Sequence, residues 1–343
     1  MIELLLTIFF ISVLLIFLGS GIWVAVSMIG VSAIGMMLFT SRPVGDAMAT
    51  TIWGTSSSWT LTALPLFVWM GEILFRTKLS ENLFKGLSPW MQKLPGGLIH
   101  VNVVGCALFA AISGSSAATV ATVGKMSIPE LRKRKYPEKI LLGSLAGSGT
   151  LGLLIPPSII LIIYGVAVQE SIAKLFIAGI IPGIMIALIF MSYVIIWSLI
   201  NKKDMPKILE EYTLFEKIRR SKQLLPVIIL ILAVIGSIYT GIATATEAAS
   251  LGVVGALILS FFQKSLTIET FKSSLLGATK TSCMIAFILA GSTFLSLAMG
   301  FTGLPRNLAM WIQSMDLSPY VLIFVLMIFY IILGMFLDGI SAV

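Results

Sequence analysis

The sequence predicts an all-α polytopic membrane protein with two inverted-topology repeats that contain re-entrant helical hairpins and broken helices. Of its 343 residues, 58% are hydrophobic and 11% are charged, whereas soluble domains carry about 25% charged residues. Many apolar runs approach the ~20 residues with which a helix crosses a bilayer core of ~30 Å. Spaced matches between the two halves of the chain indicate the repeats. We therefore expect the chain to lie in a lipid bilayer.

The charge and motif content excludes several other classes. The formal net charge of +8 lies in loops between apolar runs, as the positive-inside rule describes, so we expect no nucleic acid partner. Cys106 and Cys283 lie in apolar segments, and the chain holds no His/Cys cluster with metal-ligand spacing and no Walker A motif. The first apolar run leads straight into the next, which indicates a retained span rather than a cleaved signal peptide.

The first two apolar runs are together too long for one crossing, so we expect a break at Gly19-Ser20-Gly21. Further along, the runs alternate with short polar segments. All ten fall near 3–19, 22–39, 59–75, 96–112, 138–168, 172–200, 225–240, 243–262, 279–300 and 319–337.

An internal repeat follows from matches at nearly constant spacing. Gly21-Ile22 recurs as Gly241-Ile242, 220 positions later, and Phe67 to Gly71 resembles Phe287 to Gly291 at the same spacing. Trp90 recurs 221 positions later as Trp311. Matches in one order at nearly one offset favour two homologous halves.

The repeat predicts the domain organisation. Repeat 1 covers residues 1–200, a basic cytoplasmic linker covers 201–224, and repeat 2 covers 225–343. Since repeat 1 continues well beyond the equivalent of Val343, we expect the chain to be a truncated portion that stops within its second hairpin. Within repeat 1 we expect scaffold helices over 1–75, an arm over 79–93, a re-entrant hairpin over 95–133, a broken helix over 138–168 and a span over 172–200.

The charge pattern predicts which segments cross. Segments 76–94 and 125–139 are both basic, so a crossing between them would place positive charge on both sides of the membrane, against the rule. A hairpin that enters and returns keeps both on the cytoplasmic side, with its tip near Ser113 to Ser116. Counting the membrane crossings back from this cytoplasmic segment places the N-terminus in the periplasm. Five full crossings in repeat 1 then make repeat 2 inverted.

Three segments mix aromatic or aliphatic residues with charged or amide residues, at 79–93, 264–277 and 301–316. This pattern is typical of helices that lie in the membrane interface. They could brace the bundle or act as mobile arms.

The predicted hairpin tip is the first candidate site. It reads Ser113-Gly114-Ser115-Ser116. Irregular backbone at membrane depth survives only where protein or a cavity covers it. Free carbonyls and hydroxyls are hard oxygen ligands that suit Na⁺, and the N-terminus of the helix after the turn attracts an anion. The alternative is close helix packing by small residues.

The second candidate is a broken helix. Glycines at 143, 147, 149 and 152 precede Pro156-Pro157-Ser158 inside one apolar run. Discontinuous helices expose carbonyls and half-helix ends to substrate and ion in secondary transporters. A kinked scaffold helix is the alternative.

Two acids complete the candidates. Glu247 follows Thr244 and Thr246 at the start of an apolar helix. These three residues could bind an ion or take part in gating, or Glu247 could form a capping box with Thr244. Asp338 falls on the second hairpin tip, where it could bind a cation or cap a helix. The single histidine, His100, we expect to be structural.

These motifs together resemble the large membrane subunit of TRAP transporters, the tripartite ATP-independent periplasmic transporters. Four motifs carry the resemblance, which covers essentially the whole chain. Proline is usual in this family at the position of Ala245, which is a departure. The motifs are Ser-Gly-Ser-Ser-Ala-Ala-Thr-Val (113–120), Gly-Thr-Leu-Gly-Leu-Leu-Ile-Pro-Pro-Ser (149–158), Thr-Ala-Thr-Glu-Ala-Ala (244–249) and Phe-Leu-Asp (336–338).

The resemblance implies an elevator-type importer of the ion transporter superfamily kind in the bacterial inner membrane. It implies Na⁺ as the coupling ion, no other cofactor, a small four-helix membrane partner, and a periplasmic binding protein that delivers an organic acid such as sialic acid or a C4-dicarboxylate. The implied Na⁺ ligands are Ser113, Gly114, Ser115, Ser116, Gly147, Gly149, Thr150, Gly152 and Asp338. The implied carboxylate contacts are Ser115, Ser116, Thr119, Ser148, Pro156 and Pro157.

Three other functions stay open at this point. A stand-alone symporter of Na⁺ and divalent anions with a similar inverted-repeat fold would need no binding protein. A membrane-embedded enzyme would need clustered ionisable residues, and the spans hold few. A scaffold subunit that transports nothing would have no need of two broken hairpins.

Overall fold

The structure is a computed structural model that describes residues 2–77, 79–206, 212–222 and 224–336. Over these residues the regular structure is helical, without a strand, which confirms the all-α prediction. The chain divides into two compact units. One comprises Met1–Leu61 with Ser282–Val343, and the other comprises Thr62–Thr281.

Several helices are long and apolar enough to cross a bilayer. Three qualify by themselves: α10 (Ile172–Ile200), α13 (Ala245–Phe262) and α14 (Ile268–Thr302). Two bent helix pairs raise the number to as many as five among the described residues. Large aliphatic side chains of α10 such as Ile181 are exposed, as lipid-facing residues are in a polytopic membrane protein.

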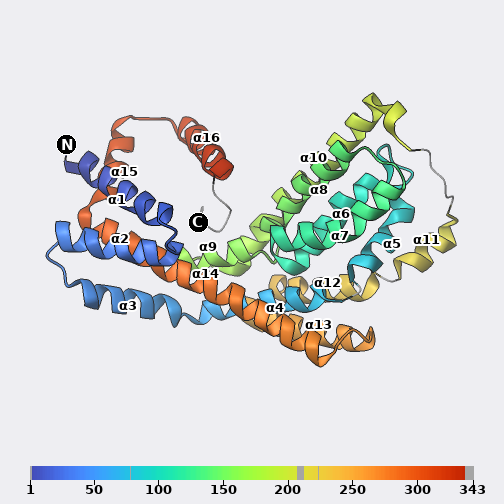
Figure 1. Ribbon diagram of the computed structural model, residues 1–343, viewed down its shortest axis with the longest axis horizontal. Helices are drawn as coiled ribbons and strands as arrows, with labels where there is room; N and C mark the ends of the chain where they lie inside the picture. The colour runs from blue at the N-terminus through green and yellow to red at the C-terminus, as the bar shows by residue number, and fades with distance from the viewer. Residues whose placement is uncertain (1, 78, 207–211, 223, 337–343) are drawn as a thin grey trace. The chain divides into compact units, whose positions relative to one another are not determined.

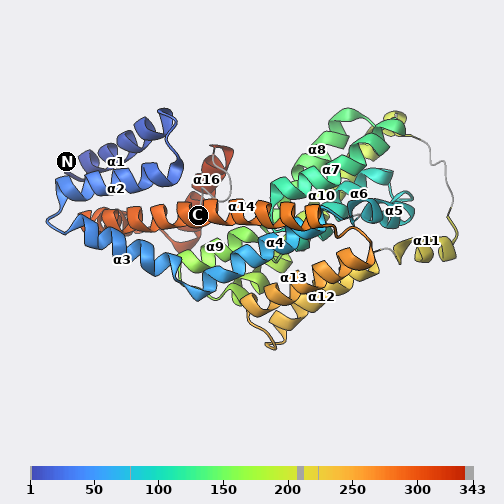
Figure 2. The ribbon, with the colours of Figure 1, turned by 60° about the horizontal axis from the view of Figure 1, so that its bottom comes forward.

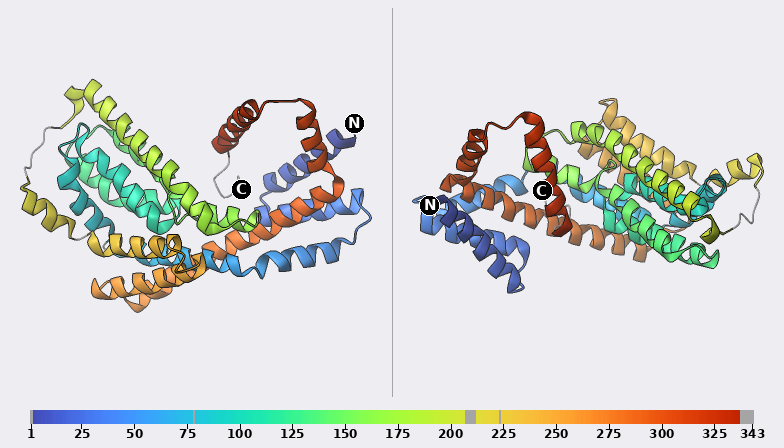
Figure 3. Two further views of the ribbon diagram at one scale, coloured as in Figure 1. Left: turned by 180° about the vertical axis from the view of Figure 1, so that it is seen from behind. Right: turned by 90° about the horizontal axis from the view of Figure 1, so that it is seen from above.

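The first unit begins with a helical hairpin. α1 (Ile2–Gly19) and α2 (Val24–Phe39) lie side by side (Figure 3). The chain reverses at Gly21, which has φ of 78°, so the predicted break at Gly19-Ser20-Gly21 is confirmed. Phe10 of α1 packs on Gly35 of α2, where a Cβ would lie 2.6 Å from the ring.

The rest of this unit packs on the second half of α14. A Cβ on Gly291 would lie 2.9 Å from the Ala25 carbonyl oxygen, so α14 approaches α2 closely. Thr55 donates to Thr293 over 3.2 Å, which joins α14 to α3 (Val44–Ser56), a helix that the apolar runs did not predict. α15 (Leu304–Ser314) and α16 (Pro319–Phe336) follow.

The prediction of a separate interfacial helix is wrong for one of the three segments. Segments 79–93 and 301–316 form separate short helices, α5 (Leu79–Met91) and α15. Segment 264–277 does not, because α14 runs unbroken for 35 residues from Ile268, about 52 Å at 1.5 Å per residue. Gly277 alone does not end a helix, and its missing side chain makes room for Glu72, whose Oε2 would lie 2.8 Å from a Cβ.

The second unit contains two helix layers that pack through small residues. α4 (Ala63–Phe75) lies along α13, and Met70 fills the space at Gly252, where a Cβ would lie 2.5 Å from the sulfur atom. α12 (Leu225–Tyr239) lies on α13 through Leu230 and Gly255 (Figure 2). A short 3-10 turn, η1 (Trp59–Thr62), precedes α4.

Most other helices of this unit form a bundle around a buried core (Figure 1). Asn102 is fully buried in the bundle, and its Nδ2 donates to Ser144 Oγ over 3.0 Å, which joins α6 to α8. The members are α6 (His100–Ser113), α7 (Ser116–Lys133), α8 (Glu138–Gly149), the 3-10 turn η3 (Thr150–Leu153), α9 (Ile159–Ala167) and α10.

Candidate functional site

The hairpin turns within two residues. α6 ends at Ser113, and Gly114 has φ of 58° and ψ of 8°, the left-handed conformation that favours glycine. Ser115 is extended and caps α7, with its hydroxyl accepting from the Ala118 N–H over 3.4 Å. The chain therefore turns between two helices at the predicted tip, Ser113 to Ser116, and the re-entrant course of this hairpin in the membrane stays a prediction.

Buried hydroxyls hold the tip together. Thr119 is fully buried, and its Oγ1 donates to the Ser115 carbonyl over 2.7 Å and lies 2.9 Å from Ser113 Oγ. The Ser115 N–H approaches Ser113 Oγ at 3.3 Å. The turn is thus fixed by its own side chains, and its backbone oxygens have defined positions.

The predicted broken helix is also present. α8 ends at Gly149, η3 follows, and a non-helical stretch leads to Ser158 before α9 begins. Ser158 Oγ donates back to the Leu153 carbonyl over 2.6 Å. This contact fixes the course of the chain through the two prolines.

The tip and the break lie against each other. The Ile159 N–H donates to the Gly114 carbonyl over 3.2 Å. A Cβ on Gly114 would lie 2.7 Å from the Pro157 carbonyl oxygen, and one on Gly152 would lie 2.8 Å from the Ser115 carbonyl. Backbone meets backbone only because both positions are glycine. We call this contact the tip–break junction, defined by residues 113–116, 152 and 157–159.

Other predicted residues of the broken helix lie elsewhere. Ser148 is fully buried, and its hydroxyl donates to the Ser144 carbonyl over 2.6 Å. Gly147 faces Phe190 of α10, and Pro156 packs near Gly179 of the same helix. Thr150 is exposed and donates to the Gly147 carbonyl over 2.7 Å. Gly149 does face the hairpin, at Val120 and Ser116.

A cavity of about 320 Å³ opens beside the tip. Ser113 and Ser115 are its hydroxyl-bearing residues from the tip, and α4 supplies the opposite wall with Glu72 as the charged residue. The lining residues are Val68, Gly71, Glu72, Phe75, Ser113, Ser115, Ala117, Ala118, Ala121, Ile159 and Thr281.

Sequence reasoning missed Glu72. Its carboxylate forms an ion pair with Arg76 one turn later, and Arg76 Nε donates to Ser273 Oγ over 3.1 Å. The signal was available, because a glutamate four residues before an arginine forms a helical ion pair and both end an otherwise apolar run. Only the fold shows that this pair borders the tip.

The remaining candidates that the structure describes do not join the junction. Thr244 and Glu247 form a capping box: the Thr244 N–H donates to Glu247 Oε2 over 2.8 Å, and the Glu247 N–H reaches Thr244 Oγ1 at 3.4 Å. The Thr246 carbonyl accepts from Ser250 over 3.0 Å. Asp338 lies outside the described residues. His100 is buried, with Nε2 2.8 Å from the Pro95 carbonyl.

Comparison with known proteins identifies the family. The family model described as "Tripartite ATP-independent periplasmic transporter, DctM component" matches residues 10–343. The chain belongs to this family. The resemblance predicted from its motifs is confirmed, and this TRAP subunit is a multi-pass component of a transporter rather than an enzyme.

Named relatives agree with the family. The C4-dicarboxylate TRAP transporter large permease protein DctM of Pseudomonas aeruginosa is 32% identical over 307 residues, which cover 89% of this chain and 71% of the relative. The sialic acid TRAP transporter large permease protein SiaM of Vibrio cholerae is 31% identical over 327 residues, which cover 94% of this chain and 75% of the relative. The 2,3-diketo-L-gulonate TRAP transporter large permease protein YiaN of Escherichia coli is 31% identical over 299 residues, which cover 85% of this chain and 68% of the relative.

The donor atoms at the tip–break junction fit an alkali cation better than a transition metal. Within the described ranges no three His, Cys, Asp or Glu side chains come together. The junction instead offers neutral hydroxyl and carbonyl oxygens from Ser113, Gly114 and Ser115, which are hard ligands. These residues therefore fit the ion that the resemblance implies.

Proposed function

We propose that this TRAP subunit imports an organic acid across the bacterial inner membrane by an elevator movement driven by Na⁺. A periplasmic binding protein delivers the acid, and a small four-helix membrane subunit completes the transporter. The observation that carries the proposal is the tip–break junction, where the turn of a helical hairpin and a broken helix bring backbone oxygens and a helix N-terminus together beside a cavity.

Na⁺ is the coupling ion in this proposal because the junction offers neutral oxygens, which are hard ligands. Ser113, Gly114, Ser115 and Gly152 are the proposed site, with Ser116 and Gly149 beside it. Glu72 also lines the cavity, and it forms an ion pair with Arg76.

The substrate is proposed to be a carboxylate. The N-terminus of α7 lies at the cavity through Ser115, and the positive end of a helix dipole attracts an anion. Ser115, Ser116 and Pro157 are its proposed contacts. Thr119 and Ser148 are fully buried, so we assign them to positioning the tip and α8. The relatives named for C4-dicarboxylate and sialic acid support this class of substrate.

Uptake by the reconstituted transporter tests the proposal. Proteoliposomes that contain this subunit and its small membrane partner should accumulate labelled acid only with the binding protein outside and an inward Na⁺ gradient. Uptake without the binding protein would instead favour the stand-alone symporter. Uptake driven by a pH gradient in Na⁺-free buffer would contradict the assignment of Na⁺.

A further inference from the structure

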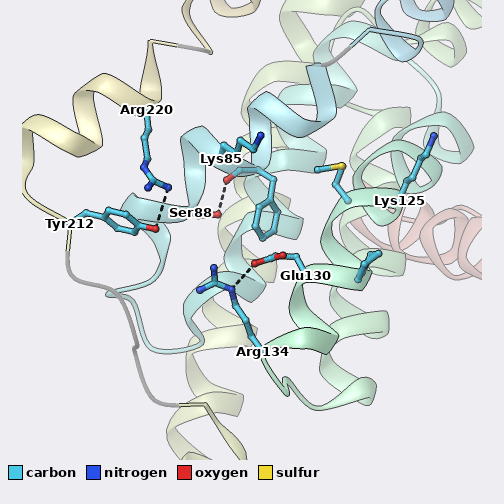
Figure 4. Close-up of a pocket in the computed structure, with 10 residues that line it drawn as sticks. Lys85, Ser88, Lys125, Glu130, Arg134, Tyr212 and Arg220 are labelled. Carbon is cyan, nitrogen blue, oxygen red and sulfur yellow. Dashed lines mark hydrogen bonds and ion pairs between the residues drawn. The ribbon is translucent and has the colours of Figure 1, made fainter.

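A second cavity lies at the end of α7 away from the hairpin tip. It measures about 480 Å³ and lies between α5, the second half of α7 and the residues around α11 (Leu214–Ser221) (Figure 4). Nothing in the transport cycle proposed above uses it. Its lining residues are Phe84, Lys85, Ser88, Lys125, Met126, Pro129, Glu130, Arg134, Tyr212 and Arg220.

The charged lining of this cavity is predominantly basic. Lys85 comes from α5, and Arg220 comes from α11. Lys125 and Arg134 come from α7 and its C-cap, and Glu130 is the carboxylate of the described lining. Over the described lining residues the formal charge is +3. Glu130 Oε1 accepts from Arg134 Nε over 2.9 Å, so Arg134 engages the acid of the described lining.

The other walls are apolar. Phe84 is buried, Met126 is half-buried, and Pro129 also lines the cavity. The Ser88 hydroxyl on the α5 side donates to the Phe84 carbonyl over 2.6 Å. A soluble phosphate would gain nothing from such walls, whereas a phosphate that carries hydrocarbon would use the cations and the apolar surface together.

Contacts between α5 and α11 hold the cavity in shape. Trp90 Nε1 donates to Ser221 Oγ over 2.8 Å, and the Lys217 ammonium lies 5.4 Å from the Trp90 ring centre. At Gly86 a Cβ would lie 2.6 Å from Leu224, so the chain after α11 approaches α5 closely.

Arg220 is placed by this packing and by a local contact. Its guanidinium lies 4.4 Å from the Tyr212 ring centre and donates to the Tyr212 hydroxyl over 3.2 Å. The arginine is therefore ordered at the cavity before any ligand binds, which lowers the entropic cost of binding.

We propose that this cavity binds the phosphate headgroup of an anionic phospholipid. Lys125 and Arg220 contact the phosphate, and Phe84 and Met126 contact the glycerol and the first methylene groups. The lipid would join the hairpin helix α7 to the linker that carries α11. The inference needs only that the subunit lies in a bilayer, and it stands whether or not the proposed transport mechanism is correct.

Native mass spectrometry of the full-length subunit with its membrane partner tests the proposal. The complex in detergent is titrated with phosphatidylglycerol, phosphatidylcholine or glycerol 3-phosphate. The variant Lys125→Gln/Arg220→Gln should weaken phosphatidylglycerol binding about tenfold or more, since each basic residue near an anionic lipid contributes about fivefold. The matched control Lys133→Gln/Arg219→Gln removes the same charge at exposed positions outside the lining and should change binding less than twofold.

Two further measurements distinguish loss of charge from a folding defect, and lipid binding from binding of a free phosphate. Lys125→Arg keeps the charge and should retain binding, which excludes a folding defect as the cause of the loss. Equal loss in both double variants, or equal binding of phosphatidylcholine, would overturn the proposal. Displacement of the lipid by millimolar glycerol 3-phosphate would assign the cavity to a soluble phosphate and would also overturn it.

Discussion

Gly114 shows how one residue determines the tip–break junction. Its left-handed backbone turns the hairpin, its carbonyl accepts from Ile159, and its missing side chain admits the Pro157 carbonyl. The sequence predicted a tip at this glycine from the flanking charge. It could not predict the partner, because contact with residue 157 depends on how α8 and α9 return to the hairpin.

Gly114→Ala should therefore be strongly destabilising. We expect a loss of about 2–5 kcal/mol, since the left-handed conformation costs an alanine about 1–2 kcal/mol and overpacking adds about 1–3 kcal/mol. Thermal unfolding in detergent measures stability, and transport should fall with it.

Gly143→Ala is the matched control. No atom lies within 4 Å of a Cβ at this exposed position in α8, so the change should stabilise the helix by about 0.5–1 kcal/mol. Equal unfolding temperatures for Gly114→Ala and wild type would show that the junction does not depend on this glycine.

At the scale of elements, the helices recur at nearly the spacing that the sequence matches predicted. α2 begins at Val24 and α13 at Ala245, and each follows a glycine with positive φ, 78° at Gly21 and 72° at Gly241. This supports the proposal of two repeats. The described parts of the halves differ at one place: α3 and α4 are separate helices, whereas α14 is continuous. Hydrophobic periodicity does not predict whether neighbouring apolar segments form one helix or two, because tertiary packing decides it.

The short helix α11 offers a pH test of an individual element. Thr213 and Glu216 form a capping box, and the hydrogen bond from the Thr213 backbone holds the pKa of Glu216 below its usual range. A lowered pKa in the folded state means that the stabilisation is complete above the unfolded pKa and is lost as pH falls through the folded value. We therefore expect α11 to lose protection below about pH 4.5, the ordinary pKa of glutamate.

Amide hydrogen exchange of α11, corrected for the intrinsic rate at each pH, measures that loss. Glu216→Gln keeps the hydrogen-bonding geometry of a capping box but does not titrate, so its protection should vary less with pH. Parallel pH profiles for the variant and the wild type would show that Glu216 does not stabilise α11.

At the scale of the whole molecule, composition and motif order were sufficient to predict the class of protein. Low charge and long apolar runs predicted the helical membrane fold, and four motifs predicted the family that residues 10–343 match. The cavity beside the tip was not predictable, because Glu72 and Ser115 are distant in sequence. The basic cavity was not predictable either, because its basic residues come from three segments that are distant in sequence.

The Na⁺ dependence of uptake by Ser115→Ala tests the central claim most directly. Initial uptake rates are measured against Na⁺ concentration in proteoliposomes with the binding protein present, and Ser250→Ala, an exposed serine on α13, is the control. If Ser115 supplies an oxygen to the ion, half-maximal activation should require about tenfold more Na⁺, the equivalent of about 1.4 kcal/mol, while Ser250→Ala matches the wild type. Active uptake with an unchanged Na⁺ curve in Ser115→Ala would contradict a Na⁺ site at the tip–break junction.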